Sequence, residues 1–502
     1  MKHLTALVVL LAAFASIAES YKILCLFPFQ GKSHFIMFDP LCKGLAKRGH
    51  EVHMISHFPQ KSPVANFTDI VNLSDGQDIT NSLSLQTGND IQNNLIYIVT
   101  DWFGVRICDL MKLPDMQKFI KNPPKVPYDL IITEVSFLFS IKYPLALSSA
   151  EMPFIDEIMG SPVNHAYHPS LYVEKAVLTT FWDRLLSFYE NTRNSYLAFW
   201  YTEVQTEMMR KYLGPNIPDI RTVEKSVSLV LVNTYMSFQG IRSLTPSIVE
   251  VGGLHHKSII VTFQELKQWL DAADEGVVYF SMGSLINMST FSNESLRSLY
   301  TSLGKIAPVK VLMRTPKGVR HPDTPNNVLT QSWIPQVPVL KHKNTKVFIS
   351  HGGLMGSQEA LYYGVPVIGI PIFADQHRNI NLFVHKNMGV RINANHITEK
   401  DMDAALNAVF NEVRQRSESR LFRDRPMKPL DTAIFWLEYI IRNGPNSLRA
   451  PSMDMPWWQL NLLDVIAFIL GCFAIVIAAV FFLLRLILKN FQKDTITEKK
   501  HN

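Results

Sequence analysis

The sequence has few cysteines and no spacing typical of a metal site. Its 502 residues include only four cysteines, and Cys472 lies in an apolar run near the C-terminus. Cys25, Cys42 and Cys108 remain, which is too few for a disulfide framework, and we interpret them as small buried apolar side chains. No His, Cys, Asp and Glu cluster has metal-ligand spacing, so we expect no metal.

Charge is also scarce, and it is unevenly distributed. Asp, Glu, Lys and Arg make up 18% of the residues, and the net charge is +6. Three of those six charges lie in the last 18 residues, so the rest of the chain is nearly neutral. A nearly neutral body argues against nucleic-acid binding, and we expect no nucleic-acid partner.

Apolar residues, in contrast, are abundant. They make up 47% of the chain, which predicts two or three core-forming domains together with membrane segments. Residues 1–20 place Lys2 and His3 before an apolar run and end in small residues, as a signal peptide does. Residues 465–484 contain no charge and are long enough to cross a bilayer as a helix.

The flanks of the second apolar run predict its orientation. Trp457 and Trp458 precede it like an interfacial aromatic belt, and the basic tail at 485–502 marks the cytoplasmic side. We therefore expect a single-pass type I protein of the endoplasmic reticulum membrane, with residues 21 to about 460 lumenal. Lys499-Lys500 resembles a retrieval signal, and a merely solvated tail is the alternative. Four N-glycosylation sequons fit this topology, at Asn66, Asn72, Asn287 and Asn293.

The first fold unit that we expect is a βαβ unit. Residues 23–27 form an apolar strand run, a loop carries His34, and a second strand covers 51–56. We expect the helix between them over 40–48, beginning at Asp39-Pro40. His34 then follows the carboxyl end of a strand, where open α/β sheets bind ligands. The loop lacks GxGxxG, which counts against a dinucleotide oxidoreductase.

A second α/β pattern begins after a turn-rich stretch near Thr245-Pro246. Residues 276–281 have the composition of a strand, and a helical pattern covers 293–306. Between them lies a glycine turn that contains Gly283 and Ser284. This turn either touches a phosphate or is a plain turn, and both alternatives stay open.

The most informative stretch of the chain lies between Trp333 and Gln376. An apolar run at 347–350 breaks at His351-Gly352-Gly353 and gives way to a helical pattern over 354–363, which a glycine can end. At such a junction, free backbone N–H groups and the positive end of the helix dipole point at one place. A diphosphate can bind there without a lysine.

This stretch resembles the signature segment of the UDP-glycosyltransferases, in particular the animal, insect-type, membrane-bound members. Ten residue types stand at the spacing of that signature: Trp333, Pro335, Gln336, His351, Gly353, Glu359, Gly364, Pro366, Asp375 and Gln376. The UDP-sugar-binding residues that we expect are Gly283, Ser284, Trp333, Gln336, His351, Gly353, Gly356, Glu359, Asp375 and Gln376.

The resemblance implies a role for each part of the signature. Trp333 stacks on uracil, and Gln336 with Glu359 holds the ribose hydroxyls. His351 and the backbone of Gly356 contact the diphosphate. Asp375 and Gln376, at the end of the signature, bind hydroxyls of the donor sugar. One departure is Met355, where animal relatives often carry asparagine.

The same resemblance concerns His34. A lone histidine in a loop is more often solvated or structural, but the family's catalytic histidine lies in a loop after the first strand, which corresponds to residues 31–34. The resemblance therefore implies that His34 is the general base. Its expected partner is an acid after a later strand. The strand at 128–134 ends in Glu134, where many relatives have aspartate, and we predict Glu134 as this catalytic partner.

Large aromatic residues are concentrated between about 162 and 212. They include Phe181, Trp182, Phe188, Tyr189, Phe199, Trp200 and Tyr201. At helical spacing such residues are usually core. Exposed, they would line an acceptor pocket or lie on a bilayer surface. The sequence favours burial of these aromatic residues in the core, but it does not show which of them are buried and which line a pocket or a surface.

The fold implied by the resemblance is of the α/β class: the GT-B arrangement of two facing Rossmann-like domains, plus a C-terminal transmembrane helix. The expected segments are a signal peptide (1–20), an N-terminal acceptor-binding domain (21–245), a C-terminal UDP-sugar-binding domain (246–445), a juxtamembrane segment (446–464), a transmembrane helix (465–484) and a cytoplasmic tail (485–502).

The implied reaction is inverting transfer of a sugar from a UDP-sugar to a hydroxyl of a small lipophilic acceptor, with no bound cofactor and no metal. The segment SHGGLMGSQEA resembles that of family members that use UDP-glucose, so UDP-glucose is the favoured donor and UDP-glucuronate is the alternative. Two other interpretations stay open: a membrane lipid or specific endogenous metabolite as acceptor, and a nucleotide-sugar-binding membrane protein without turnover. The expected partners are the UDP-sugar, the acceptor and a membrane, and homo-oligomerisation is left open.

Overall fold

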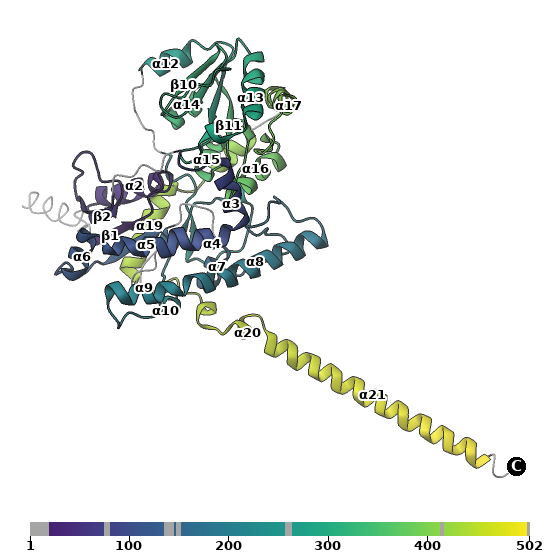
Figure 1. Ribbon diagram of the computed structural model, residues 1–502. Coiled ribbons are helices and arrows are strands. Elements are labelled where there is room, and N and C mark those ends of the chain that lie inside the picture. Colours follow the sequence, from purple (N-terminus) through teal and green to yellow (C-terminus); the bar gives the residue numbers. More distant parts are fainter. Residues whose placement is uncertain are drawn as a thin grey trace, which may run out of the picture. The chain divides into compact units, whose positions relative to one another are not determined.

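The structure is a computed structural model that describes residues 20–74, 81–134, 145–146, 152–256, 264–411 and 416–498. The predicted signal peptide up to residue 19 and the lysine pair at 499–500 lie outside these ranges. The chain divides into two compact units, residues 1–449 and 450–502. Figure 1 shows two sheets flanked by helices in the first unit and the long helix α21 in the second.

The first sheet has seven strands in the order β3-β2-β1-β4-β5-β6-β7, and all its paired strands are parallel. Its strands are β1 (Lys22–Phe27), β2 (Glu51–Ser56), β3 (Phe67–Asn72), β4 (Leu130–Glu134), β5 (Leu145–Ala146), β6 (Val230–Val232) and β7 (Ile248–Glu250).

The second sheet has six strands in the order β10-β9-β8-β11-β12-β13, again all parallel. Its strands are β8 (Val277–Ser281), β9 (Lys310–Arg314), β10 (Val328–Gln331), β11 (Thr345–Ser350), β12 (Val367–Gly369) and β13 (Gly389–Arg391). Two parallel sheets confirm the α/β prediction.

Helices connect the strands and cover both sheets. In the first part of the chain they are α2 (Lys32–Lys47), α3 (Leu85–Asn93), α4 (Leu95–Thr100), η1 (Asp101–Val105), α5 (Arg106–Cys108), η2 (Asp109–Lys112), α6 (Pro114–Lys121), α7 (Pro153–Ile158), α8 (Phe181–Thr202), α9 (Val204–Leu213), α10 (Ile220–Glu224) and α11 (Met236–Gln239). After β7 they are α12 (Gln264–Asp271), η3 (Met288–Thr290), α13 (Asn293–Lys305), α14 (Gln336–Lys341), α15 (Leu354–Tyr363), α16 (Asp375–His385), α17 (Glu399–Asn411), α18 (Arg416–Arg423), α19 (Pro429–Asn443), η4 (Pro451–Asp454), α20 (Trp457–Leu460) and α21 (Leu463–Glu498).

The central strands are apolar because helices cover both of their faces. All five residues of β8 are buried, and β1 and β11 are nearly as enclosed. Parallel strands buried on both sides are expected to form continuous apolar runs rather than alternating ones. Apolar burial of this kind is the main favourable contribution to folding.

The predicted helix boundary after β1 is wrong. Instead of starting at Pro40, α2 begins at Lys32 with Gly31 as N-cap, and Pro40 lies inside it. A proline within a helix costs about 3 kcal/mol. Burial of Phe35, Phe38 and Leu41 offsets that cost, and His34 therefore lies in the first helical turn rather than in a loop.

The local pattern around residue 351 is confirmed. β11 ends at Ser350, α15 covers Leu354–Tyr363, and Gly364 ends the helix in the left-handed conformation at φ 69°. Glycine adopts this conformation without the steric cost that a Cβ brings, which is why it terminates helices so often.

The chain does not pass from the first sheet to the second at a single point. β7 still pairs with β6 in the first sheet, although it lies beyond residue 245. α19 returns from the second sheet and packs on α2, with Ala433, Ile434 and Leu437 in the apolar core beside β1 (Figure 1). The division into domains at 21–245 and 246–445 stays a prediction.

The second unit contains one helix of the kind predicted for a membrane span. Within α21, the 27 residues Leu463–Lys489 are long and apolar enough to cross a bilayer. No other helix among the described residues meets that criterion.

Candidate active site

Each sheet changes the direction of its strand order at one place. In the first sheet the chain moves from β1 outward to β2 and β3, then returns to β4 on the other side of β1. In the second sheet the equivalent place lies between β8 and β11. Ligands of open α/β sheets bind beside the carboxyl ends of the strands at these positions.

His34 and Glu134 meet at the first of these positions. β1 and β4 are adjacent and parallel, so the start of α2 and the last residue of β4 lie at the same edge. The Nδ1 atom of His34 lies 2.7 Å from Oε1 of Glu134, whose side chain is 8% exposed. If Nδ1–H donates to the carboxylate, Nε2 is left with its lone pair as a proton acceptor.

A cavity of about 460 Å³ brings the other predicted site residues together. Eleven of the twelve line it: His34, Gly283, Ser284, Trp333, Gln336, His351, Gly353, Gly356, Glu359, Asp375 and Gln376. The twelfth, Glu134, is linked to the cavity through its contact with His34. Residues from the carboxyl ends of β1, β8, β9 and β11 thus share one space.

One end of the cavity carries a buried carboxylate held by a polar network. The Nε2 atom of Gln336 donates to Oε2 of Glu359 at 2.7 Å, and the hydroxyl of Tyr279 donates to Oε1 of Gln336 at 3.2 Å. His255 Nε2 lies 3.2 Å from the other oxygen of Glu359. A carboxylate fixed in this way can accept hydrogen bonds from two adjacent hydroxyls, such as those of a ribose.

An indole stands beside this carboxylate. Trp333 is 51% exposed, which leaves a flat apolar surface for a base. The ammonium of Lys32, from the first turn of α2, lies 4.5 Å from the centre of the Trp333 ring. This cation–π contact joins the two sheets across the cavity.

The turn after β11 fits an anion. Gly353 is the N-cap of α15 and has no side chain to cap it, and the N–H of Leu354 donates to the Asp375 carboxylate, so the N–H groups of Met355 and Gly356 are the ones that an anion can use. Burial, with a further contribution from the charge of Arg314, lowers the pKa of His351 to about 4. His351 is therefore neutral at physiological pH and can donate one ring N–H to a phosphate oxygen.

Two glycines are required beside this histidine. A Cβ on Gly283, whose φ is +74°, would lie 2.6 Å from the His351 ring, and one on Gly353 would lie at the same distance. Either distance is shorter than real Cβ contacts allow. The absence of a Cβ at these two positions therefore leaves room for the imidazole ring of His351. It also lets a ligand approach the backbone closely.

Arg314 is a cavity residue that the sequence interpretation missed. It is the last residue of β9 and donates to the carbonyl oxygen of Gly283. Its position at the carboxyl end of a strand, like those of His351 and Gly283, was the available signal. His255 was missed as well, because it lies in the turn-rich stretch after β7, for which no site was predicted.

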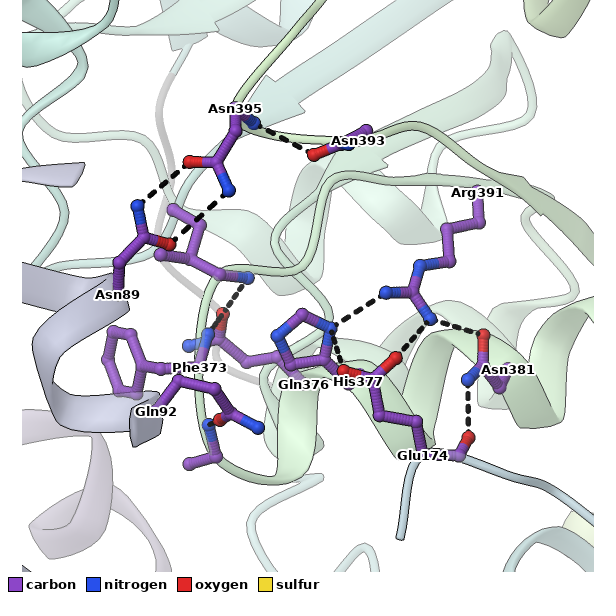
Figure 2. Close-up of polar contacts among 12 residues, drawn as sticks. Asn89, Gln92, Glu174, Phe373, Gln376, His377, Asn381, Arg391, Asn393 and Asn395 are labelled. Carbon is purple, nitrogen blue, oxygen red and sulfur yellow. Dashed lines mark hydrogen bonds and ion pairs between the residues drawn. The ribbon is translucent and has the colours of Figure 1, made fainter. Parts of the chain in front are cut away.

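The turn between β12 and α16 brings Asp375 and Gln376 to the cavity. Burial raises the pKa of Asp375, an effect opposed by the hydrogen bond that Asn379 donates to it and by nearby His34. The Oε1 atom of Gln376 accepts from the backbone N–H groups of Ile372 and Phe373, as Figure 2 shows. The amide oxygen of Gln376 thus holds its own turn, and its NH₂ group is the part left for a ligand.

A segment from the first half of the chain is fastened to the second sheet. We name residues 81–93 the clasp. Its Asn81 N–H donates to Ser284 O at 2.8 Å, and Gln92 Oε1 accepts from the N–H of Ala374 at 2.8 Å. Asn89 and Asn395 face each other through their amides (Figure 2). The clasp therefore contacts both turns that flank the cavity.

Met355, the departure from the family pattern, lines the cavity and also packs against the apolar core of the first sheet. Its side chain makes an apolar contact between the two sheets, whereas an asparagine at this position would offer an amide group. Over the described residues, no three His, Cys, Asp or Glu side chains gather in a way that could hold a metal ion.

Comparison with known proteins gives a consistent result. The family model for "UDP-glucoronosyl and UDP-glucosyl transferase" matches residues 124–501. UDP-glucosyltransferase 2 of Dactylopius coccus is 34% identical over 511 residues, with 98% of each chain covered. UDP-glucuronosyltransferase 2A2 of Homo sapiens is 33% identical over 407 residues, with 78% of this chain and 74% of the relative covered.

A solved structure supports the fold. The crystal structure of the glycotransferase of kitacinnamycin aligns with a TM-score of 0.56 at 16% identity, over 84% of this chain and 99% of that one. This likeness confirms the GT-B fold. The chain belongs to the UDP-glycosyltransferase family and is an enzyme that transfers a sugar from a UDP-sugar donor to an acceptor.

Proposed function

We propose that the enzyme transfers glucose from UDP-glucose to a hydroxyl of a small lipophilic acceptor, with inversion at the anomeric carbon. The observation that carries this proposal is the His34–Glu134 pair, which opens into the same cavity as the predicted nucleotide residues. Glucose is favoured because a relative at 34% identity is named as a UDP-glucosyltransferase.

In the proposed reaction, Nε2 of His34 takes the proton from the acceptor hydroxyl, and Glu134 stabilises the imidazolium that forms. The acceptor oxygen attacks the anomeric carbon as the bond to UDP breaks on the opposite face. The leaving diphosphate is stabilised by the N-terminus of α15 and the neutral His351 ring, while Asp375 and Gln376 hold the sugar.

The test is incubation of microsomes that contain the expressed chain with UDP-glucose, UDP-glucuronate and UDP-galactose, against a panel of phenols and steroids. We expect glucosides to predominate and the His34→Ala variant to form them about 100-fold more slowly or less. Products carrying glucuronate instead of glucose would overturn the donor assignment and leave the site assignment intact. A product found only with membrane lipids would overturn the assignment of a small acceptor.

We also propose that the enzyme resides in the endoplasmic reticulum membrane with the first unit in the lumen. The proposal rests on the span in α21, on the predicted leader and on the sequons.

A further inference from the structure

A buried arginine in α16 has no counter-charge. Arg378 is 6% exposed, and its Nη1 atom donates to the carbonyl oxygen of Pro169 at 3.1 Å. Its Nε atom is buried and has no hydrogen-bond partner among the residues that the structure describes. Burial, followed by the charge of Arg242, lowers the pKa of Arg378 to about 10, so the guanidinium is still charged at neutral pH. A buried charge without a counter-charge is costly, which points to a partner from outside the chain.

Arg378 lines a second cavity, of about 400 Å³, which we name the Arg378 cavity. Its wall consists mainly of residues from α4, α8 and the start of α16. The turn before α16 is shared with the cavity that contains His34, because Ala374 and His377 line the Arg378 cavity while Asp375 lines the other. The volume of the Arg378 cavity is within the range of small-molecule sites.

The inner face of α8, which borders this cavity, is polar. The buried residues of this helix are Asp183, Ser187, Asn191, Asn194, Ser195 and Ala198. They face inward because they find partners there: Asp183 accepts from Lys175 Nζ at 2.5 Å, and Ser187 Oγ accepts from the N–H of Ser170 at 2.9 Å.

This orientation of α8 corrects the interpretation of its aromatic residues as core. Most of the predicted set is exposed, namely Phe181, Trp182, Phe188, Tyr189 and Trp200. Phe199 and Tyr201 are half-buried, and Tyr201 is the member of the set that lines the Arg378 cavity.

The two acids in the wall of the cavity do not compensate Arg378, because both have other partners. Glu174 accepts from Arg391 at 3.0 Å and lies 3.4 Å from Nδ1 of His377, as Figure 2 shows. Glu190 accepts from Nδ2 of Asn194 at 2.9 Å. The positive charge of Arg378 is therefore the one that the described wall leaves unbalanced.

The composition of the wall indicates the kind of ligand. The bond from Nη1 to the backbone leaves the Nε edge of the guanidinium, and such an edge matches the two oxygens of a carboxylate. A doubly charged phosphate would face the two glutamates of the wall, which favours a single negative charge. Leu95, Leu197 and the ring of Tyr201 offer apolar surface beside these polar groups.

We propose that the Arg378 cavity binds a small organic monocarboxylate, with its carboxylate on Arg378 and its apolar part against Leu197 and Tyr201. A carboxylate there has two sources that share this chemistry, a carboxylated acceptor and a separate effector. Binding itself does not depend on the proposed function, whereas the distinction between the two sources rests on it.

Binding is tested with the full-length chain in detergent by fluorine NMR. The probes are 4-fluorobenzoate and its uncharged analogue 4-fluorobenzamide, with UDP at saturation so that the anion site at α15 is filled. We expect the benzoate to bind about tenfold more tightly or better, the usual effect of a charge-assisted hydrogen bond. Arg378→Met should remove this difference. Arg184→Met, at a half-buried arginine of α8 outside the cavity wall, should keep it.

A second pair of variants locates the bound probe. Leu197→Trp fills the cavity while Arg378 stays in place, and it should weaken benzoate binding about tenfold or more. Leu186→Trp puts the same ring on the exposed side of α8 and should leave binding unchanged. UDP affinity in every variant must match that of the parent chain. Absence of benzoate binding, equal affinity for the two probes, or benzoate affinity unaffected by Arg378→Met would overturn the proposal.

Kinetics then distinguish the two sources. With 4-hydroxybenzoate and 4-hydroxybenzamide as acceptors, a rise in KM in Arg378→Met for the benzoate alone identifies a carboxylated acceptor. A change in kcat for the amide when 4-fluorobenzoate is added, with its KM unchanged, identifies an effector. Absence of any transfer would contradict the proposed function, while the NMR test would still decide whether the cavity binds a carboxylate.

Discussion

At the scale of single residues, the site depends on one short contact between the first turn of α2 and the end of β4. Nδ1 of His34 and Oε1 of Glu134 are 2.7 Å apart because β1 and β4 end side by side. His34→Ala should leave UDP binding intact, since the predicted nucleotide residues belong to the second sheet. Turnover should fall about 100-fold or more, the usual contribution of a general base. Calorimetry with UDP and initial rates with donor and acceptor separate the two effects.

Substitutions of Glu134, the partner acid of His34, should lower turnover to different extents. Glu134→Gln should also reduce turnover, because a neutral amide no longer stabilises the imidazolium. Glu134→Asp shortens the side chain by one methylene and lengthens a contact that is now 2.7 Å, so activity should fall only partly. The expected order of turnover is wild type, Asp, Gln, then His34→Ala, with similar UDP affinity throughout. Full activity in Glu134→Ala would show that this acid does not hold His34.

The buried carboxylate of Glu359 governs nucleotide affinity in our proposal. Its oxygens face Gln336 and His255, so its geometry is fixed before the ligand arrives. Glu359→Ala should cost about 1.5–3 kcal/mol of binding, the usual value of charge-assisted hydrogen bonds. The Kd for UDP should rise about tenfold or more. Glu399→Ala, at the start of α17, is the control and should bind UDP normally. An unchanged Kd in Glu359→Ala would remove this residue from the site.

His351 predicts a pH dependence of stability. Its pKa is about 4 in the fold and near 6.5 in the unfolded chain, so between these values the unfolded state binds more protons. Stability therefore falls as the pH falls from 6.5 towards 4. In His351→Asn the slope of unfolding free energy against pH should be smaller by up to about 1.4 kcal/mol per pH unit. Urea unfolding in detergent at pH 7, 6 and 5 measures it.

The control for this measurement is His396→Asn, which removes an exposed histidine. Its slope should match that of the wild type. Equal slopes in all three proteins would contradict the proposed neutrality of His351 in the folded protein.

At the scale of elements, the clasp is one of the contacts that fasten the first half of the chain to the second sheet. Gly88 of α3 lies against the turn before α16, and a Cβ there would be 2.5 Å from Cγ2 of Ile372. Gly88→Val should push the clasp away from that turn and displace Asp375 and Gln376. We expect KM for the UDP-sugar to rise several-fold, with a smaller effect on the urea midpoint.

The matched variant for the clasp is Gln86→Val, an equally bulky side chain on the exposed side of the same helix. It should leave KM for the UDP-sugar unchanged, because the side chain at this position is exposed. A similar rise in both variants would point to a loss of helix propensity rather than to a clash at Ile372.

At the scale of the whole molecule, α21 and the sequons predict the topology. Protease added to sealed microsomes should remove only the tail after about Arg485 and leave a protected fragment of nearly full length. Treatment with a peptide N-glycosidase should then lower its apparent mass. Of the four sequons, Asn66, Asn72 and Asn293 are exposed. Digestion of the first unit in intact vesicles would contradict a lumenal position.

The sequence alone determined the features that depend on neighbouring residues. The strand, glycine turn and helix around His351 were predicted from an apolar run, a pair of glycines and a helical period, all within about 20 residues. The β1 and β4 strands placed His34 and Glu134 at the same edge, because parallel strands of one sheet align their carboxyl ends. The span in α21 followed from length and composition, since a bilayer core of about 30 Å sets both.

Only the tertiary structure decided which faces are covered and which distant segments meet. The start of α2 was misplaced because Pro40 is an unfavourable helix residue by itself, and only burial against the sheet and α19 offsets its cost. His255 reaches the cavity from a segment with no local signal of a site, and Arg314 reaches it from the end of a strand whose place in the sheet only the fold defines. The aromatic residues of α8 were expected in the core because periodicity reports two faces of a helix but not which one turns inward. That choice depends on Asp183 and Ser187 finding partners on other segments, which no local pattern contains.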